Sequence, residues 1–393
     1  MLKEGKMKGK LKLVKFISLA LSLILVFTSF AEADIYEYFD DLKPQDYINR
    51  MFSNERKGEL SGNVVNFDDI EDMIHIFNPE VLNNWNSWEN NQSAKDVYEE
   101  YQDAADILFS SAGDQDSDLQ EGMIMAQGRA MQIQADKNAS DSYTNFLTDY
   151  LIEKQLVLAT KILDINYQKS TFELLNAEAA IKEAERLEAK ANDALSFGNG
   201  TQVELLTAKK AVVDAKSAKI AAESAQRTYK RKLLVNCGKT ISDDIYIAPI
   251  TLTAFNAYSI NLDADYQNAL AHNIQYEIYR RKIENARTEE VKNEFQILYD
   301  AAPQKIYNDL ENKYRNILDV MDSISNRELS LRLANENLTK ARDEFGSGNI
   351  SSKDLSTAQY NVTVAQNNLQ AVKYDLEVAI ITYQNSVMGY GDC

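Results

Sequence analysis

The chain contains 393 residues, with 42 Lys and Arg against 60 Asp and Glu, so its formal net charge is −18. An excess of negative charge this large disfavours binding to nucleic acid, or to anionic lipid through a basic surface. The two histidines, His75 and His272, lie far apart in sequence, and each is expected to be structural. No phosphate loop, dinucleotide fingerprint or nucleophile elbow is present, so the sequence predicts no enzyme activity, no cofactor and no metal.

Residues 1–33 are typical of an export signal. Several lysines precede an apolar run from Phe16 to Phe30, and Ala31-Glu32-Ala33 provides a small-x-small cleavage site. The apolar run is short for a permanent membrane span, so we expect cleavage, with a retained N-terminal anchor as the alternative. Either outcome predicts an exported protein of the cell envelope or the extracellular space.

The region after the signal has a less regular pattern. Residues 34–63 are acidic and aromatic and are expected to form a loosely ordered lead-in. A short helix is predicted at about 66–76 and another at about 80–109. The polar stretch 110–122 is then expected to break the helix.

Three acidic residues in this break resemble the opening of a calcium-binding loop. They are Asp114, Asp116 and Asp118, but Leu119 and Met125 occupy the positions where such a loop needs glycine and glutamate. The pattern therefore favours a polar break over a calcium site.

Two very long helices are predicted next, because no proline lies between Pro79 and Pro249. The first should run from about 140 to 196, roughly 85 Å at 1.5 Å per residue, and its partner from about 201 to 236. Small side chains recur at alternating steps of three and four, which is the seam of two helices packed along each other. Before the turn this stripe comprises Ala177, Ala180, Ala184, Leu187, Ala191 and Ala194.

The same organisation recurs after a linker at 241–262. One helix is expected over 263–300, Ala301-Ala302-Pro303 should break it, and the next helix should run on to a second turn. We therefore expect a first helical repeat at 64–240 and a second at 263–393, related by internal duplication.

The turn inside each hairpin has the same composition in both repeats. It contains a glycine that can end a helix in the left-handed conformation, an asparagine suited to a tight turn, a hydroxyl residue that can cap the next helix, and an acid three residues later that can reach back to the cap. These are Gly198, Asn199, Thr201 and Glu204 in the first repeat, and Gly348, Asn349, Ser351 and Asp354 in the second.

These residues resemble the TolC-type outer-membrane efflux protein family, whose duplicated chains carry two long hairpins with tips of the pattern G-x-x-[ST]-x-x-[DE]-L. Segments 268–273 and 279–286 look like the helix that starts each repeat in that family. The resemblance implies a homotrimeric tube whose tips dock on a periplasmic adaptor, or membrane-fusion protein, serving an inner-membrane transporter. Adaptor contacts are then expected at Gly198, Asn199, Gly200, Thr201, Gly348, Asn349, Ile350 and Ser351.

The resemblance is incomplete at one place in each repeat. The family inserts a pair of membrane strands there, and each such strand needs about 9 to 11 residues of alternating apolarity. The corresponding segments, 110–122 and 301–303, are too acidic or too short. We therefore expect an all-α fold of duplicated long antiparallel coiled-coil hairpins, a TolC-like helical tube domain without a recognisable β-barrel.

Two functions fit this fold. The first is an export conduit that docks by its tips to an adaptor. The alternative is a secreted coiled-coil scaffold or spacer without transport activity, in which the tips only connect helices.

Two further residue types leave alternatives open. Cys237 and Cys393 each follow the last helix of a hairpin, and could form a disulfide after export or remain as thiols. Trp85 and Trp88 could pack between helices or mark a contact surface, and packing is favoured.

Overall fold

The computed structural model describes residues 39, 42–49, 54–90, 94–112, 118–138, 141–241, 244–253 and 255–393. The predicted export signal lies outside these residues. In the segment expected to be a loosely ordered lead-in, the described residues include helices α2 (Pro44–Ile48) and α3 (Asn54–Ser61). Leu60 of α3 is buried in the core, so this part of the segment is helical and packed.

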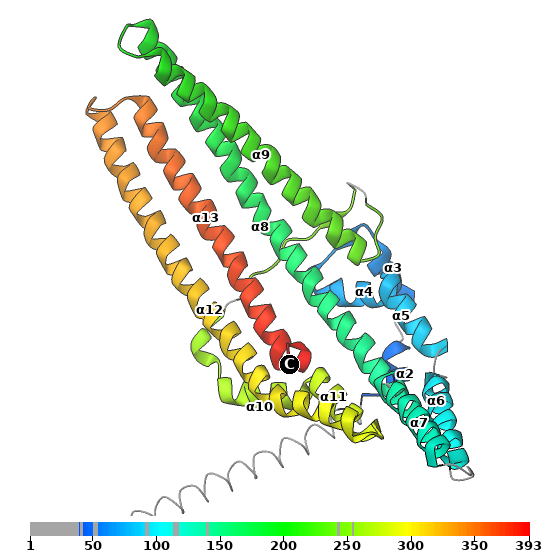
Figure 1. Cartoon of the computed structure of the whole chain (residues 1–393). Helices are drawn as coiled ribbons and strands as arrows, with labels where there is room; N and C mark the ends of the chain where they lie inside the picture. The colour runs from blue at the N-terminus through cyan, green and yellow to red at the C-terminus, as the bar shows by residue number, and fades with distance from the viewer. Residues whose placement is uncertain are drawn as a thin grey trace, which may run out of the picture.

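Four long helices form two antiparallel hairpins that lie side by side (Figure 1). The first hairpin consists of α8 (Ser142–Ser196) and α9 (Gln202–Asn236), and the second of α12 (Glu289–Gly346) and α13 (Ser352–Asn385). Helix α8 packs against α13, which leaves α9 at one edge of the layer and α12 at the other. The predicted all-α fold of duplicated long hairpins is confirmed.

Apolar side chains along the helix-helix seams hold each hairpin together. Those buried along the seams include Ala184, Leu205, Val212, Leu338 and Leu369. The contact between the hairpins is more polar, since Asn176 exchanges amide hydrogen bonds with Asn367 and Asn368 at 3.0 and 2.8 Å. Lys169 Nζ of α8 also lies 2.6 Å from Asp375 Oδ1 of α13.

The chain before α8 forms a series of shorter helices. The helix expected at 66–76 is the 3-10 turn η1 (Phe67–Asp69) followed by α4 (Ile70–Phe77), and the one at 80–109 corresponds to α5 (Pro79–Asn90) and α6 (Ala94–Ala112). Helix α6 packs against α7 (Asp118–Asn138). The break predicted for 110–122 is therefore helical up to Ala112 and again from Asp118, and residues 113–117 lie outside the described part.

The second repeat differs from the single helix predicted over 263–300. After the linker strand β2 (Tyr246–Ile247), which pairs in parallel with β1 (Val64–Val65), and the turn η2 (Ala257–Ser259), the chain forms α10 (Leu262–His272) and α11 (Ile274–Asn285). Asn273 has an extended backbone, ψ 114°, and its side chain accepts a hydrogen bond from Tyr276 N–H. An asparagine cap in the middle of the segment thus ends one helix and starts the next.

The break expected at Ala301-Ala302-Pro303 is also wrong, because α12 continues through Pro303. Proline removes one backbone donor and disfavours a helix interior by about 3 kcal/mol. Ala302, Ile306 and Leu310 are nearly or fully buried on the same side of α12. Packing of this apolar face against the core offsets the local cost, which the sequence pattern alone does not reveal.

The two repeats correspond at their bases as well as at their turns. Asn78 caps α5 by accepting hydrogen bonds from Glu80 and Val81 N–H, and its amide donates to the carbonyl of Asn236 at the end of α9. Asn273 caps α11 in the same way, and its amide lies 3.4 Å from the carbonyl of Gly391, just after the π-helix η3 (Ser386–Tyr390).

The main core lies at this base and is rich in aromatic residues. Trp85 and Trp88 are buried against Phe146 of α8, so their predicted packing role is confirmed. The carboxylate of Glu153, 1% exposed, accepts hydrogen bonds from Trp85 Nε1 and Tyr47 Oη, each at 2.8 Å, and lies 3.0 Å from His75 Nδ1. These contacts tie α2, α4 and α5 to the lower part of α8.

Candidate functional site

The first hairpin turn is built as the sequence predicts. Gly198 has φ +73°, in the left-handed region that glycine adopts without strain. Its N–H donates to the carbonyl of Leu195, and Asn199 N–H donates to Ala194 at 2.8 Å. This pair of bonds is the Schellman arrangement, which satisfies the last carbonyls of α8 and reverses the chain.

Reciprocal capping then starts α9. Thr201 Oγ1 accepts a hydrogen bond from Glu204 N–H at 3.2 Å, and Thr201 N–H donates to Glu204 Oε2 at 2.7 Å. Gly200 is half-buried, and a Cβ on it would lie 2.9 to 3.0 Å from atoms of Leu195 and Ala194, whereas the equivalent position of the second turn is occupied by Ile350.

The second turn repeats this geometry. Gly348 has φ +73°, and Asn349 N–H donates to Glu344 at 2.8 Å. Ser351 and Asp354 form the second capping box, with both bonds at 3.2 Å. The contacts of Asp354 with the hydroxyl and backbone N–H of Ser351, together with Lys190, lower the pKa of its carboxyl group.

The two tips differ in the side chains they expose. At the first tip Phe197 is 78% exposed and Val203 71% exposed, and Leu206 is exposed one turn further along α9. At the same offset, the second tip carries Ser347, Lys353 and Ser356. At these three positions the first tip is therefore apolar and the second polar, although the second tip exposes Phe345 to 43%. The difference was not predicted from the sequence, although the fixed offset of 150 residues between the repeats contains it.

The second tip rests on the flank of α8, below the first tip (Figure 1). Lys353 Nζ lies 2.8 Å from Asp193 Oδ2, and Lys190 Nζ lies 3.3 Å from Asp354 Oδ1. These two ion pairs place the second turn beside a level of α8 that lies short of its end. Along the axis of α8, the first turn therefore lies about three to five residues farther from the base than the second turn, a distance of about 5 to 7 Å.

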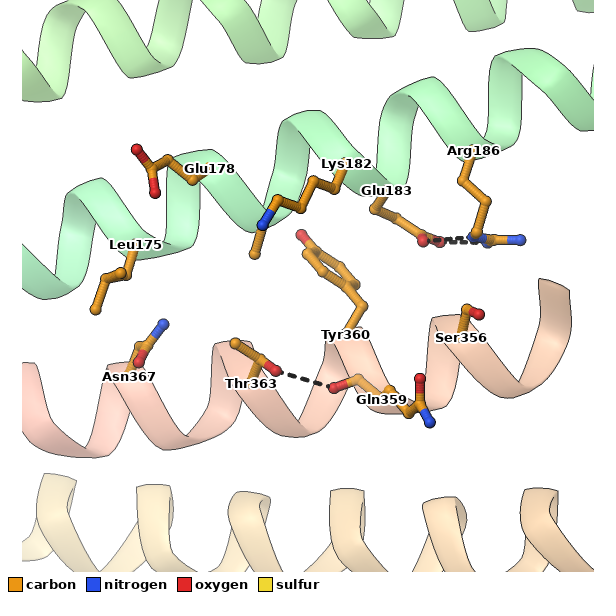
Figure 2. Close-up of a pocket in the computed structure, with 11 residues that line it drawn as sticks. Leu175, Glu178, Lys182, Glu183, Arg186, Ser356, Gln359, Tyr360, Thr363 and Asn367 are labelled. Atoms are coloured by element: carbon orange, nitrogen blue, oxygen red, sulfur yellow. Dashed lines mark hydrogen bonds and ion pairs between the residues drawn. The ribbon is translucent and has the colours of Figure 1, made fainter. Parts of the chain in front are cut away.

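Behind the tips, α8 and α13 enclose a groove of about 470 Å³ (Figure 2). Glu178, Lys182, Glu183 and Arg186 face it from α8, and Tyr360 projects across it from α13. The groove is thus lined mainly by charged and amide side chains.

Arg186 links the two walls of this groove. Its guanidinium donates two hydrogen bonds to Glu183, at 2.6 and 2.7 Å, and a third to Thr357 Oγ1 of α13. Thr357 in turn donates to Glu183 Oε1 at 3.0 Å. The bonds from Arg186 hold the pKa of the Glu183 carboxyl group below its usual value.

The structure brings all eight predicted contact residues to one end of the molecule, four on each tip. Six of them are exposed, whereas Gly200 and Ile350 are half-buried. The groove behind them and the apolar first tip were not anticipated.

Other reactive groups lie away from this end. Cys237 and Cys393 are both free thiols in this chain, and burial raises the pKa of each to about 12. Among the described residues, no three His, Cys, Asp or Glu side chains are grouped as a metal site would require.

A helix that crosses a bilayer needs about 20 consecutive, mainly apolar residues. Within the described residues, none combines sufficient length with sufficient apolar content to cross a bilayer.

Comparison with solved structures shows what this fold is similar to. A membrane protein from Pseudomonas aeruginosa superposes with a TM-score of 0.53 over 82% of this chain and 92% of its own, at 12% identity. The outer-membrane channel OprN gives 0.49 over 82% and 90% at 8% identity, and the Campylobacter jejuni CmeC outer membrane channel gives 0.46 over 69% and 68% at 11%.

No protein-family model matches the sequence, and no curated protein matches it either. At 12% identity the similarity to the Pseudomonas protein concerns the fold alone. It extends over nearly all of that protein and over 82% of this chain.

Proposed function

We propose that this protein is a conduit component of an export assembly in the cell envelope. In this proposal the signal at 1–33 directs export, and three copies, each made of the repeats 64–240 and 263–393, form a helical tube. The tips dock on the coiled-coil hairpin of an adaptor that serves an inner-membrane transporter. The protein carries out no catalysis in this role and needs no cofactor, metal or nucleic acid.

The observation that carries the proposal is the pair of equivalent tips. Each has a left-handed glycine and a reciprocal capping box, so its backbone is fixed before a partner arrives. A preorganised surface loses less conformational entropy on binding. Exposed Phe197 and Val203 provide an apolar contact of the kind that marks interaction sites. The fold shared with a membrane protein supports an envelope role.

Cross-linking from the tips tests the proposal. Cysteines introduced as Asn199→Cys and Asn349→Cys would carry a photo-crosslinker in the cells that make the protein, and captured proteins would be identified by mass spectrometry. We expect an adaptor or transporter component from both positions. The control is Ser61→Cys on the exposed surface of α3, away from the tips (Figure 1). Capture of no export component from either tip would favour the scaffold alternative.

A further inference from the structure

The first hairpin turn contains a dipeptide that the second turn lacks. Gly200 follows Asn199, and the sequence has no other glycine directly after an asparagine. At the equivalent position of the second turn, Ile350 follows Asn349. Asparagine is one of the chemically labile residues of proteins, and a following glycine leaves it unshielded because glycine has no Cβ. The two turns thus give their asparagines different neighbours.

We propose that Asn199 is a site of spontaneous deamidation, so that the first tip slowly acquires a carboxylate while Asn349 stays unmodified. In this reaction the backbone nitrogen of Gly200 loses its proton and attacks Cγ of Asn199. The side-chain nitrogen takes up that proton and leaves as ammonia, and a succinimide ring remains. Water then opens the ring at either carbonyl and gives aspartate or isoaspartate. The reaction consumes only water and needs no enzyme.

The nucleophile of this reaction is free in the structure. Among the described residues, the N–H of Gly200 donates no hydrogen bond, although the N–H groups on either side of it do. Asn199 N–H donates to the carbonyl of Ala194, and Thr201 N–H donates to Glu204 Oε2. An N–H that is held by an acceptor must give up that bond before it can react. The nitrogen of Gly200 can attack without this cost.

The side chain under attack is also free. Asn199 is exposed at the tip, and in the part of the chain that the structure describes its amide makes no hydrogen bond. Exposed side chains change rotamer rapidly, so the amide can turn toward the nitrogen of Gly200 without losing a partner. Exposure also gives water access to the succinimide. The site therefore meets the requirements of both steps.

The second turn has the same backbone geometry with a different neighbour. Gly198 and Gly348 both have φ +73°, and the N–H groups of Asn199 and Asn349 each donate at 2.8 Å to a carbonyl of the preceding helix. The N–H of Ile350 likewise has no acceptor within the described residues. Its branched side chain is stiff and crowds the approach of the asparagine amide to that nitrogen. The two turns therefore separate the effect of the following residue from that of backbone geometry.

The modification changes both the charge and the backbone of the first tip. Either product adds a carboxylate to the turn between the exposed side chains of Phe197 and Val203. Isoaspartate also lengthens the backbone by one carbon, between the end of α8 and the cap of α9. Under the proposed function, on which only this consequence rests, a charged tip would contact an apolar partner surface less well.

Mass spectrometry of the whole chain, incubated at mildly alkaline pH and then digested, tests the modification. The peptide that contains Asn199 should gain about 1 Da, the difference between an amide and an acid, and should separate into aspartate and isoaspartate forms. The peptide that contains Asn349 should stay unchanged over the same time. The guanidinium-unfolded chain, in which the same dipeptide should react, verifies that the incubation is long enough. An intact Asn199 in the folded protein would overturn the proposal.

Exchange of the following residue provides the second measurement. Ile350→Gly gives the second turn the same dipeptide, and Asn349 should then react at a rate within about threefold of that of Asn199, because glycine removes the shielding side chain. Ile350→Val keeps a branched side chain and should leave Asn349 intact. An unreactive Asn349 in Ile350→Gly, or equal reaction in Ile350→Val, would overturn the inference. A modified Asn199 in a chain whose tips capture no export component would instead contradict the proposed function.

Discussion

Gly198 and Gly348 adopt the same left-handed backbone conformation, φ +73°, at positions 150 residues apart. Nothing lies within 4 Å of a Cβ added at either position, so the backbone angle alone constrains them. Both turns therefore require a residue that adopts the left-handed conformation without strain, and both repeats have glycine at that position.

This requirement predicts the effect of removing either glycine. Gly198→Ala and Gly348→Ala should each destabilise the protein by about 1 to 2 kcal/mol, because an L-residue in the left-handed region has that cost. Urea unfolding would measure it. Gly346→Ala, in the helical last turn of α12, also has free space for a methyl group and should be neutral or slightly stabilising. A loss at Gly346 equal to that at Gly348 would contradict the explanation.

The difference between the tips predicts unequal roles in partner binding. Phe197→Ser should weaken adaptor capture by about tenfold or more, since exposed aromatic anchors often dominate interface energetics. Its equivalent in the second tip is already serine, and Ser347→Ala should change capture by less than about threefold. Quantitative cross-linking from Asn199 would measure both. Equal losses would mean that the two tips contribute alike.

The fully buried carboxyl group of Asp164 predicts a pH dependence of stability. Burial raises its pKa from 3.8 to about 7, against the opposing hydrogen bond from Gln168, and its Oδ2 has no hydrogen-bond partner among the described residues. The folded protein thus binds a proton between these pH values that the unfolded chain releases. The contribution of Asp164 to the free energy of unfolding is therefore fully present below pH 3.8. It is lost as the pH rises to 7, by about 4 kcal/mol in total.

The test compares the wild type with Asp164→Asn. Denaturant unfolding at pH 5 and pH 8 should show a larger loss of stability in the wild type than in the variant, because the amide cannot ionise. Other groups titrate equally in both proteins and cancel in the difference. Parallel pH profiles would show that Asp164 is not the group responsible.

The buried carboxylate of Glu153 predicts a large structural effect at the base. Glu153→Ala should lower the free energy of unfolding by about 3 kcal/mol or more, because it leaves the buried donors of Trp85 and Tyr47 without an acceptor. Glu173→Ala, at an exposed position on the same helix, should have little effect. Thermal unfolding of the two variants side by side would show whether only Glu153→Ala lowers the stability.

The long hairpins and their turns could be predicted from the sequence because their determinants are local. Seam residues at alternating spacing, a left-handed glycine and a capping box each act within a few residues. Both turns appear where predicted, whereas Leu187 of the predicted seam is 41% exposed. The helix through Pro303 could not be predicted in this way, because burial of Ala302 and Ile306 against distant helices maintains it. The split at Asn273 depends on one cap in a pattern that otherwise reads as continuous helix.

The candidate site was predicted only in part for the same reason. The residue types at the two turns were sufficient to predict both tips. The groove and the contact of Lys190 with Asp354, by contrast, join helices far apart in sequence. Those features depend on how the hairpins lie against each other, which no local pattern specifies.

The offset between the two tips constrains any partner that engages both. A partner with a flat end would meet the apolar first tip and stop about 5 to 7 Å short of the polar second one. Simultaneous contact therefore requires a stepped surface, or two partner elements of unequal reach. A symmetric assembly of this chain would present such steps alternately around its rim, so the same partner could not bind equally well at every position.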